Sequence, residues 1–399
     1  MLKITLISNS HIKELFHNMR STGTYAISTT LGESVQAFVP NPLPPGKPEL
    51  APPCYVEPNR NAEIALARLS GVSGLVPSVD WLLYSAIRKE ALLTSQIEGT
   101  QATLTDLFDE EAGFAVSNTD DVQEVTNYLR AFRMVQDNLR DPAGLPLSVR
   151  LLCNAHRLLL DGARGAGKQP GELRRSQNWI GGTRPGNAVF VPPPPERVAD
   201  LLADMERFMH ATPALDLPPL VKIALIHAQF ETVHPFLDGN GRIGRLLIAA
   251  LLEHWSLLPQ PLMYLSGYLK KHQAEYYRRL SAIRTDGDWE GWVSFFLEGV
   301  VQASTDAERG IVAIASLVAG HRRMLLASPK AGPASYRLFE MLPMMPRFNI
   351  ERARQSLGTS FPTANAAVKV LEELGIVTEL TGQKKNRSYS YQPYIELMT

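Results

Sequence analysis

Apolar residues recur at steps of three and four along most of this chain, which is the period of an amphipathic helix. In the segment 119–139, Val122, Val125, Leu129 and Phe132 fall on one stripe. The same spacing, with glycine or proline at several ends, predicts a mainly α fold with helices at 61–71, 78–95, 119–139, 147–161, 196–210, 218–232, 241–256, 273–284 and 289–325.

Two segments interrupt this helical pattern. Residues 178–195, "NWIGGTRPGNAVFVPPPP", combine glycines and β-forming residues with four final prolines, so we expect a small β-hairpin flap followed by polyproline. Residues 39–58 are rich in proline, which excludes regular helix or central strand. We therefore expect residues 1–58 to form an extended N-terminal arm.

The last part of the chain, 334–399, changes character again. Three short helical patterns precede two β-rich runs around a polar turn, an order that predicts a winged helix-turn-helix domain. Ser360 would cap its third helix, and 378–391 would form the wing. Eight Lys and Arg stand against six Glu here, a mild net charge of +2, so both DNA contact and protein docking stay open.

Composition narrows the class of protein. The 399 residues are 45% hydrophobic and 20% charged, with 40 basic and 40 acidic side chains, so no global field attracts DNA or a membrane surface. With only Cys54 and Cys153 and no uninterrupted apolar run of membrane-spanning length, we expect a cytoplasmic protein without a membrane span. The first twenty residues look non-secretory, and Met19 is an alternative start.

The stretch "HPFLDGNGRIGR", 234–245, places many polar groups where a helix begins. The first turn of a helix has unpaired N–H groups and a positive dipole end, so it attracts anions. Gly239 and Gly241 allow a close backbone approach and a nest of donors. Arg242 and Arg245, three positions apart, share a face beside that nest. Together they suit a ligand with more than one phosphate.

Two further residues of this stretch indicate the chemistry. Asp238 would repel phosphate unless a cation such as Mg²⁺ lies between them. His234 titrates near neutral pH when unperturbed and can take a proton from an incoming hydroxyl. The stretch thus predicts phosphoryl or nucleotidyl transfer. On the preceding helix, His227 and Glu231 fit a structural histidine and a loop-bracing carboxylate better than a metal pair.

This stretch resembles the signature of Fic-domain proteins, H-x-F-x-[DE]-G-N-G-R-x-x-R, at every fixed position. Most proteins of that family transfer AMP from ATP to a Ser, Thr or Tyr hydroxyl of a target protein. The resemblance implies a Fic-type helical bundle with ATP and Mg²⁺. It assigns the following roles: general base, His234; Mg²⁺ ligand, Asp238; α- and β-phosphate binding, Asn240, Gly241 and Arg242; γ-phosphate binding, Arg245; buried loop anchor, Phe236.

A second resemblance lies upstream, in "LLTSQIEGTQATL", 92–104. It is similar to the family's inhibitory motif, [ST]-x-x-x-E-[GN], with Thr94, Glu98 and Gly99 in the fixed places. In such members the glutamate pairs with the second arginine of the signature, which here is Arg245, and blocks the γ-phosphate. In some relatives the same glutamate helps water to remove AMP.

The family also uses its flap to bind a target segment as an added strand, which implies docking by Thr183, Val189, Phe190 and Val191. We expect five parts along the chain: the arm at 1–58, a helical region with the inhibitory motif at 59–145, a Fic core at 146–300, a connecting helix at 301–333 and the winged helix at 334–399.

Several alternatives stay open. The chain could instead be a winged-helix transcription regulator whose Fic core senses nucleotide, or could transfer a different nucleotide. Apolar positions in 305–326 favour a homodimer.

Overall fold

The computed structural model describes residues 20–76, 78–211 and 217–398. The expectations for a non-secretory start and for an alternative start at Met19 concern residues outside the described ones. The described chain is mainly helical, as predicted. The helices that precede the C-terminal part are α2 (Val56–Val72), α3 (Val79–Ile97), α4 (Leu104–Glu111), α5 (Thr119–Arg140), α6 (Val149–Leu159), α7 (Pro195–His210), α8 (Pro219–Val233), α9 (Asn240–His254), α10 (Leu265–Lys271), α11 (Gln273–Asp286) and α12 (Trp289–Ala327).

Two helices, α8 and α9, form the centre of the bundle. Every residue of α8 from Ile223 to Val233 is buried, and such a helix, apolar around most of its circumference, belongs inside a core. Helix α9 packs against α8, and α5, α6 and α3 contact α9. The loop between α8 and α9 contains 234–239. The signature stretch is therefore held by the most deeply buried helices of the fold.

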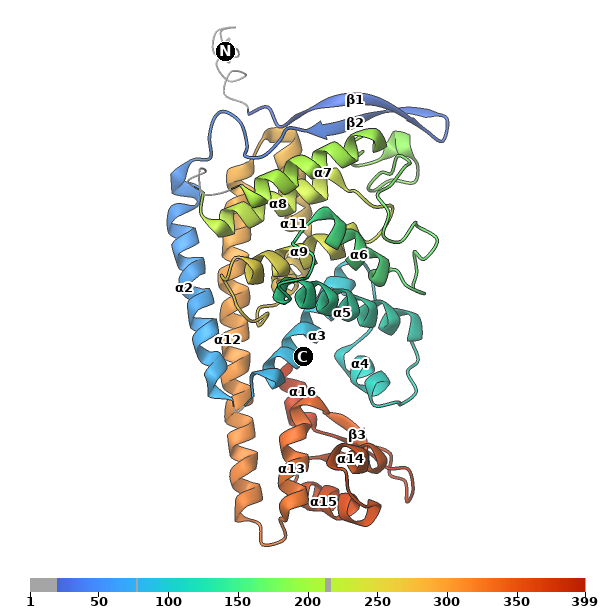
Figure 1. The fold of residues 1–399 in the computed structure, drawn as a ribbon, viewed down its shortest axis with the longest axis vertical. Helices are drawn as coiled ribbons and strands as arrows, with labels where there is room; N and C mark the ends of the chain where they lie inside the picture. The colour runs from blue at the N-terminus through green and yellow to red at the C-terminus, as the bar shows by residue number, and fades with distance from the viewer. Residues whose placement is uncertain (1–19, 77, 212–216, 399) are drawn as a thin grey trace, which may run out of the picture.

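Helix α12 runs along most of the long axis of the molecule, with α2 beside it (Figure 1). The predicted boundary between core and connecting helix at 300/301 lies within this one continuous helix. Among the described residues, α12 alone has the length and mean hydropathy, 1.3 over its candidate window, of a membrane-spanning helix. It also contacts α2, α8, α10, α11 and α16, as a helix of a packed bundle does.

The expected extended arm is wrong between residues 23 and 40. Here β1 (Gly23–Thr30) and β2 (Glu33–Pro40) form an antiparallel hairpin across one end of the bundle (Figure 1). In β2 the side chains of Val35, Ala37, Phe38 and Val39 are buried, and Gly32 has a positive φ at the turn. The proline-rich remainder is short, because α2 begins at Val56.

The flap at 178–195 is a loop closed by one antiparallel bridge, Ile180–Phe190, with a 3-10 turn (Pro185–Asn187) at its tip. Gly181 and Gly182 both have positive φ, and Pro185 lacks an N–H, so longer strands do not form. The N-terminal hairpin lies against this flap, since the Phe38 N–H donates to the Val191 carbonyl at 3.0 Å.

The C-terminal part follows the predicted order of three helices and then two β-rich runs, with two additions. A short strand precedes the second helix, and a further helix, which the sequence did not predict, ends the described chain. The elements are α13 (Pro333–Met341), β3 (Arg347–Asn349), α14 (Ile350–Leu357), α15 (Phe361–Glu373), β4 (Thr378–Glu379), β5 (Ser388–Ser390) and α16 (Gln392–Met398), with sheet order β3-β5-β4. Ser360 caps α15 as expected, its side chain accepting from the Thr363 N–H.

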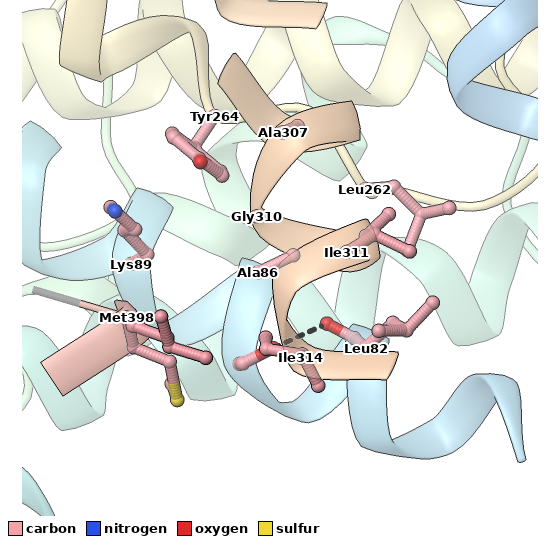
Figure 2. Close-up of a pocket in the computed structure, with 12 residues that line it drawn as sticks. Leu82, Ala86, Lys89, Leu262, Tyr264, Ala307, Gly310, Ile311, Ile314 and Met398 are labelled. Atoms are coloured by element: carbon pink, nitrogen blue, oxygen red, sulfur yellow. Dashed lines mark hydrogen bonds between the residues drawn. The ribbon is translucent and has the colours of Figure 1, made fainter. Parts of the chain in front are cut away.

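Helix α16 returns to the bundle, where it meets α3 and α12 (Figure 2). The small cleft at this junction, about 30 Å³, is lined mainly by apolar side chains such as Leu82, Ile311 and Met398. Lys89 and Tyr264 also line this cleft, and the Lys89 ammonium lies over the Tyr264 ring, 4.7 Å from its centroid. A cleft of this volume is too small for a nucleotide, so the candidate site lies elsewhere.

Candidate active site

His234 ends helix α8 in the left-handed conformation, at φ 49° and ψ 61°. A non-glycine residue seldom adopts this conformation, and Pro235 directly after it disfavours continuing the helix. The buried Arg174 holds the turn: its Nε donates to the His234 carbonyl at 2.9 Å and its Nη2 to the Val233 carbonyl at 3.2 Å. The imidazole is thus presented from a backbone that its surroundings fix.

The loop after His234 closes on itself through Asn240. The Asn240 side chain accepts from the Phe236 N–H and donates to the Phe236 carbonyl, both at 2.8 Å. Its side-chain amide is therefore engaged in shaping the loop. Phe236 is buried and stacks on the His156 ring at 3.9 Å, as expected of a loop anchor.

His156 of α6 links this loop to a second one. Its Nδ1 accepts from the Gly171 N–H at 2.8 Å, so the Nε2 carries the hydrogen and donates to the Asp238 carbonyl at 3.0 Å. Burial lowers the pKa of His156 to about 4, which keeps the ring neutral in this arrangement. Sequence analysis missed this residue, because its role arises from contacts 82 positions away.

Helix α9 begins with Gly239 as its N-cap at φ 75°. The N–H groups of the first turn have no partner within the helix, and Gly241 of this turn lines a pocket. A Cβ on Gly241 would lie 2.3 Å from Glu98 Oε1 and 2.9 Å from Arg245 Nη1. Glycine at 241 is therefore required for a carboxylate, or a phosphate in its place, to approach this turn.

The inhibitory motif meets the signature at Arg245. Glu98 Oε1 lies 2.5 Å from Arg245 Nη2, and Thr94 accepts from Arg245 Nε at 2.6 Å through its hydroxyl. The Arg245 side chain is almost fully buried, whereas that of Glu98 is about one-third exposed, so the pair is accessible from the pocket. Gly99 follows with φ +98°, a conformation suited to glycine, and turns the chain away from α3.

The other arginine of the signature has a different partner. Arg242 is buried and its Nη1 lies 3.4 Å from Glu124 Oε2 of α5. Asp238 is farther, with its Oδ1 3.7 Å from Arg242 Nη2, and its side chain is 42% exposed. The structure thus brings Asp238, Arg242, Arg245 and the start of α9 together, and it adds Glu124, which the sequence analysis did not single out.

A pocket of about 520 Å³ opens beside Gly241 and Arg245, whereas Asp238, Arg242 and Glu124 are not among its lining residues. It is large enough for a nucleotide. One side is formed by the inhibitory and signature residues, and the other by the flap and α11. The lining residues include Glu98, Glu231, His234, Gly241, Arg245, Ile180, Phe190, Tyr276, Tyr277 and Arg284.

Two titratable groups in this pocket are shifted toward their neutral forms. Burial, followed by the nearby Arg174 guanidinium, lowers the pKa of His234 to about 4. Burial also raises the pKa of Glu231 to about 7, against the opposing effect of Arg245. His234 Nδ1 and Glu231 Oε1 are buried and lack a hydrogen-bond partner among the described residues. A neutral imidazole at physiological pH is the form that accepts a proton.

Of the four predicted flap residues, Val189 and Phe190 line this pocket, whereas Thr183 and Val191 are not among its lining residues. Val189 is 79% exposed, while the Phe190 ring lies 3.8 Å from the Arg284 guanidinium carbon. The Val191 carbonyl already accepts from Phe38 of β2, and the Thr183 N–H donates to the Asn187 side chain within the flap. Thr183 and Val189 are exposed, whereas Phe190 and Val191 are half-buried.

The residues present fit a Mg²⁺ ion that arrives with a nucleotide. Among the described residues no group of three or more His, Cys, Asp or Glu side chains could hold a metal ion. Mg²⁺ bound to phosphates needs only one or two protein carboxylates. The half-exposed Asp238 at the helix start supplies one such carboxylate. His227, in contrast, is buried between the Gly244 carbonyl and the Tyr276 hydroxyl, which confirms a structural role.

Comparison with known families agrees with this geometry. The model of the Fic/DOC family matches residues 146–252, and that of the Fic/DOC family N-terminal region matches residues 56–137. Residues 146–252 of this chain form a Fic domain. The N-terminal match contains the inhibitory motif, and the Fic match contains His156 and the whole signature stretch.

Curated relatives of this Fic-domain protein include two from fruit flies, both named protein adenylyltransferase Fic. That of Drosophila yakuba is 32% identical over 128 residues, which are 32% of this chain and 23% of the relative. That of Drosophila persimilis is 30% identical over 157 residues, 39% of this chain and 27% of the relative. The chain thus spans about a quarter of the length of these relatives.

Solved structures show the same fold. A Fic family protein from Desulfovibrio desulfuricans superimposes with a TM-score of 0.55 at 22% identity, covering 86% of this chain and 98% of that one. A Fic domain containing signaling protein from Bacteroides thetaiotaomicron gives a TM-score of 0.53 at 18% identity, covering 63% and 97%. At these identities the likeness concerns the fold alone.

Proposed function

We propose that this Fic-domain protein is a protein adenylyltransferase, which moves AMP from ATP to a Ser, Thr or Tyr hydroxyl of a target protein or of itself. The observation that carries the proposal is a neutral imidazole, His234, in one pocket with a helix N-terminus and Arg245. The names of the curated relatives, whose matches cover part of the chain, support the same activity.

The chemistry follows from these positions. The target hydroxyl gives its proton to His234 as its oxygen bonds to the α-phosphorus of ATP. The bond from that phosphorus to the bridging oxygen breaks, and pyrophosphate leaves. The N–H groups at the start of α9, with Arg242 and Arg245, stabilise the negative charge on the phosphates. Asp238 would hold Mg²⁺, which neutralises phosphate charge when bound.

We also propose that Glu98 inhibits the protein in cis. Its carboxylate occupies Arg245 Nη2, the group that the family resemblance assigns to the γ-phosphate. A charge-assisted Arg–carboxylate contact is strong enough to compete with a phosphate oxygen. Because the Glu98 side chain is partly exposed, solvent or nucleotide can reach it and displace it.

For the target, we propose docking along the flap, with its backbone positioning the target hydroxyl near His234. The exposed Val189 side chain supports this role. The Val191 carbonyl is already paired with β2, so the target segment would use the flap positions that the N-terminal hairpin leaves free.

The C-terminal part is proposed to be a winged-helix module. The order α13, β3, α14, α15, β4, β5 and the sheet order β3-β5-β4 support this. Lys384 and Lys385 are exposed between β4 and β5, where a wing would lie. A gel shift of random duplex DNA that disappears in Lys384→Ala/Lys385→Ala would assign it to DNA, and no shift at low salt would assign it to protein docking.

The activity is tested with ATP labelled at different phosphates. With Glu98→Gly protein and Mg²⁺, we expect protein-bound label from α-labelled ATP and none from γ-labelled ATP. Label from γ-labelled ATP would indicate phosphoryl transfer instead. Glu98→Gly/His234→Ala serves as the matched control and should remain unlabelled. No label from either ATP, with a purified folded protein, would favour a nucleotide sensor over an enzyme.

A further inference from the structure

One buried carboxylate contacts three segments near the loop 234–239 and the start of α9. Glu124, on α5, is only 4% exposed. Its Oε2 accepts from the Thr100 hydroxyl at 2.9 Å and lies 3.4 Å from Arg242 Nη1. Its Oε1 accepts from Arg164 Nε at 2.6 Å. A single side chain thus contacts the segment after the inhibitory glutamate, the first turn of α9 and the loop after α6.

Arg242 depends on this carboxylate for its placement. The guanidinium is 4% exposed, and a buried charge is costly unless an opposite charge lies near it. Its other carboxylate neighbour, Asp238, is farther away at 3.7 Å and mostly oriented by the Gly239 N–H at 2.6 Å. Arg242 Nε has no hydrogen-bond partner among the described residues. Glu124 is therefore the nearer of the two carboxylates beside the Arg242 guanidinium, and Nε is left without a protein partner among the described residues.

A second acidic residue on α5, Asp121, distinguishes the contact with Arg242 from the other contacts of Glu124. Asp121, one turn before Glu124, is buried to the same degree and accepts from Arg164 Nη2 at 2.7 Å. It also accepts from the Gln101 N–H at 2.6 Å. Arg242 is not among its contacts in the described part of the chain. Like Glu124, Asp121 therefore contacts Arg164 and the segment after Glu98, but unlike Glu124 it does not contact Arg242.

We propose that Glu124 is a positioning residue for nucleotide binding, which holds Arg242 in the orientation that receives the phosphates of ATP. This inference rests on the proposed function for the identity of the nucleotide. It predicts that loss of the Glu124 charge weakens ATP binding through Arg242 rather than reducing the amount of folded enzyme.

The test uses the full chain with Glu98→Gly, so that inhibition does not mask the effect. Adding Glu124→Gln should raise the KM for ATP about tenfold, since charge-assisted hydrogen bonds of this kind contribute at the level of one decade or more, with kcat changed less than about threefold. The matched control Asp121→Asn should leave both constants within about twofold. ATP affinity from calorimetry should change in the same way as KM.

The outcomes are distinct. The role of Glu124 would be overturned by an unchanged KM for ATP in Glu124→Gln, or by an equal rise in KM in Asp121→Asn. In either case, label transfer by Glu98→Gly alone would still support the proposed enzyme activity. A fall in kcat at constant KM would mean a merely structural residue. If Glu98→Gly transfers no label, calorimetry alone decides the inference. If Glu124→Gln does not fold, Glu124→Asp keeps the charge, shortens its reach and should weaken ATP binding likewise.

Discussion

Glu98 and Arg245 are 147 positions apart, yet their side chains form a 2.5 Å ion pair at the nucleotide pocket. The guanidinium is buried, and the carboxylate faces both it and the pocket. The Arg245 guanidinium and, to a smaller extent, Arg242 hold the pKa of Glu98 below its usual value despite burial, so the carboxylate is charged at neutral pH. The pair therefore joins the N-terminal helical region to the Fic signature.

Removing the Glu98 carboxylate should activate the protein. With Glu98→Gly, Arg245 is free to receive a phosphate, and we expect transfer of AMP to rise by about tenfold or more, the effect of one charge-assisted contact. Glu98→Gln, which keeps the shape and removes the charge, should give an intermediate rate. Initial rates with α-labelled ATP measure this. Equal rates for all three proteins would exclude Glu98 as the inhibitor.

The acid limb of the pH–rate profile should lie unusually low. A free imidazole loses its basic form below about pH 6.5, but His234, with its pKa lowered to about 4, keeps it. We expect kcat/KM of Glu98→Gly to stay within about twofold between about pH 6 and pH 8. Glu98 itself raises the pKa of His234, so its removal moves the limb further down. A limb near the ordinary histidine value would contradict the base being held neutral.

Protein stability should fall as pH decreases from about 6.5 to about 4.5. His156, His227 and His234 have pKa values lowered to about 4, 3 and 4, so the unfolded chain binds protons that the native chain does not. Glu231, with its pKa raised to about 7, opposes them, because there the native state holds the extra proton. For these four groups, three histidines against one carboxylate leave an excess of two protons in the unfolded state, which corresponds to at most about 2.7 kcal/mol per pH unit.

A histidine variant tests which groups cause this dependence of the unfolding free energy on pH. His227→Gln should reduce it by at most about 1.4 kcal/mol per pH unit, whatever its effect on stability at neutral pH. Glu231→Gln should steepen it by a similar amount. Denaturant unfolding at several pH values measures both. A slope that neither substitution changes would mean that other groups control acid stability.

Thr94 should contribute to stability through Arg245. Its hydroxyl accepts from Arg245 Nε at 2.6 Å, and its carbonyl accepts from Nη2 at 3.1 Å. Thr94→Val removes the hydroxyl and leaves a buried N–H without its acceptor, which costs about 1–3 kcal/mol. Thr94→Ser keeps the acceptor and should be close to the unmodified protein. Thermal unfolding distinguishes them, and equal melting temperatures for Val and Ser would contradict the role of this bond.

Local sequence predicted the centre of the site well, because the signature residues act within one loop and one helix start. The positions 234 to 245 need only the geometry of a helix N-terminus to come together. Glu98 was reached only through resemblance to a short motif, since no local rule joins it to Arg245. Most helices were predicted because their apolar stripes are long and regular.

The residues that were missed act through tertiary contacts. His156, Arg174 and Glu124 are ordinary positions in their own helices or loops, and their roles depend on partners from 59 to 118 positions away. The hairpin β1–β2 was missed because the prolines that follow it indicate an irregular segment. The β-forming residues of 24–30 and the glycine at 32 were the available signal.

The most direct test of the account is intact-mass measurement of Glu98→Gly protein after incubation with ATP and Mg²⁺. We predict a population heavier by one AMP group per modified hydroxyl, absent without ATP and absent in Glu98→Gly/His234→Ala. An unchanged mass in the single variant would contradict AMP transfer, and the same added mass in the double variant would contradict the role of His234 as its general base.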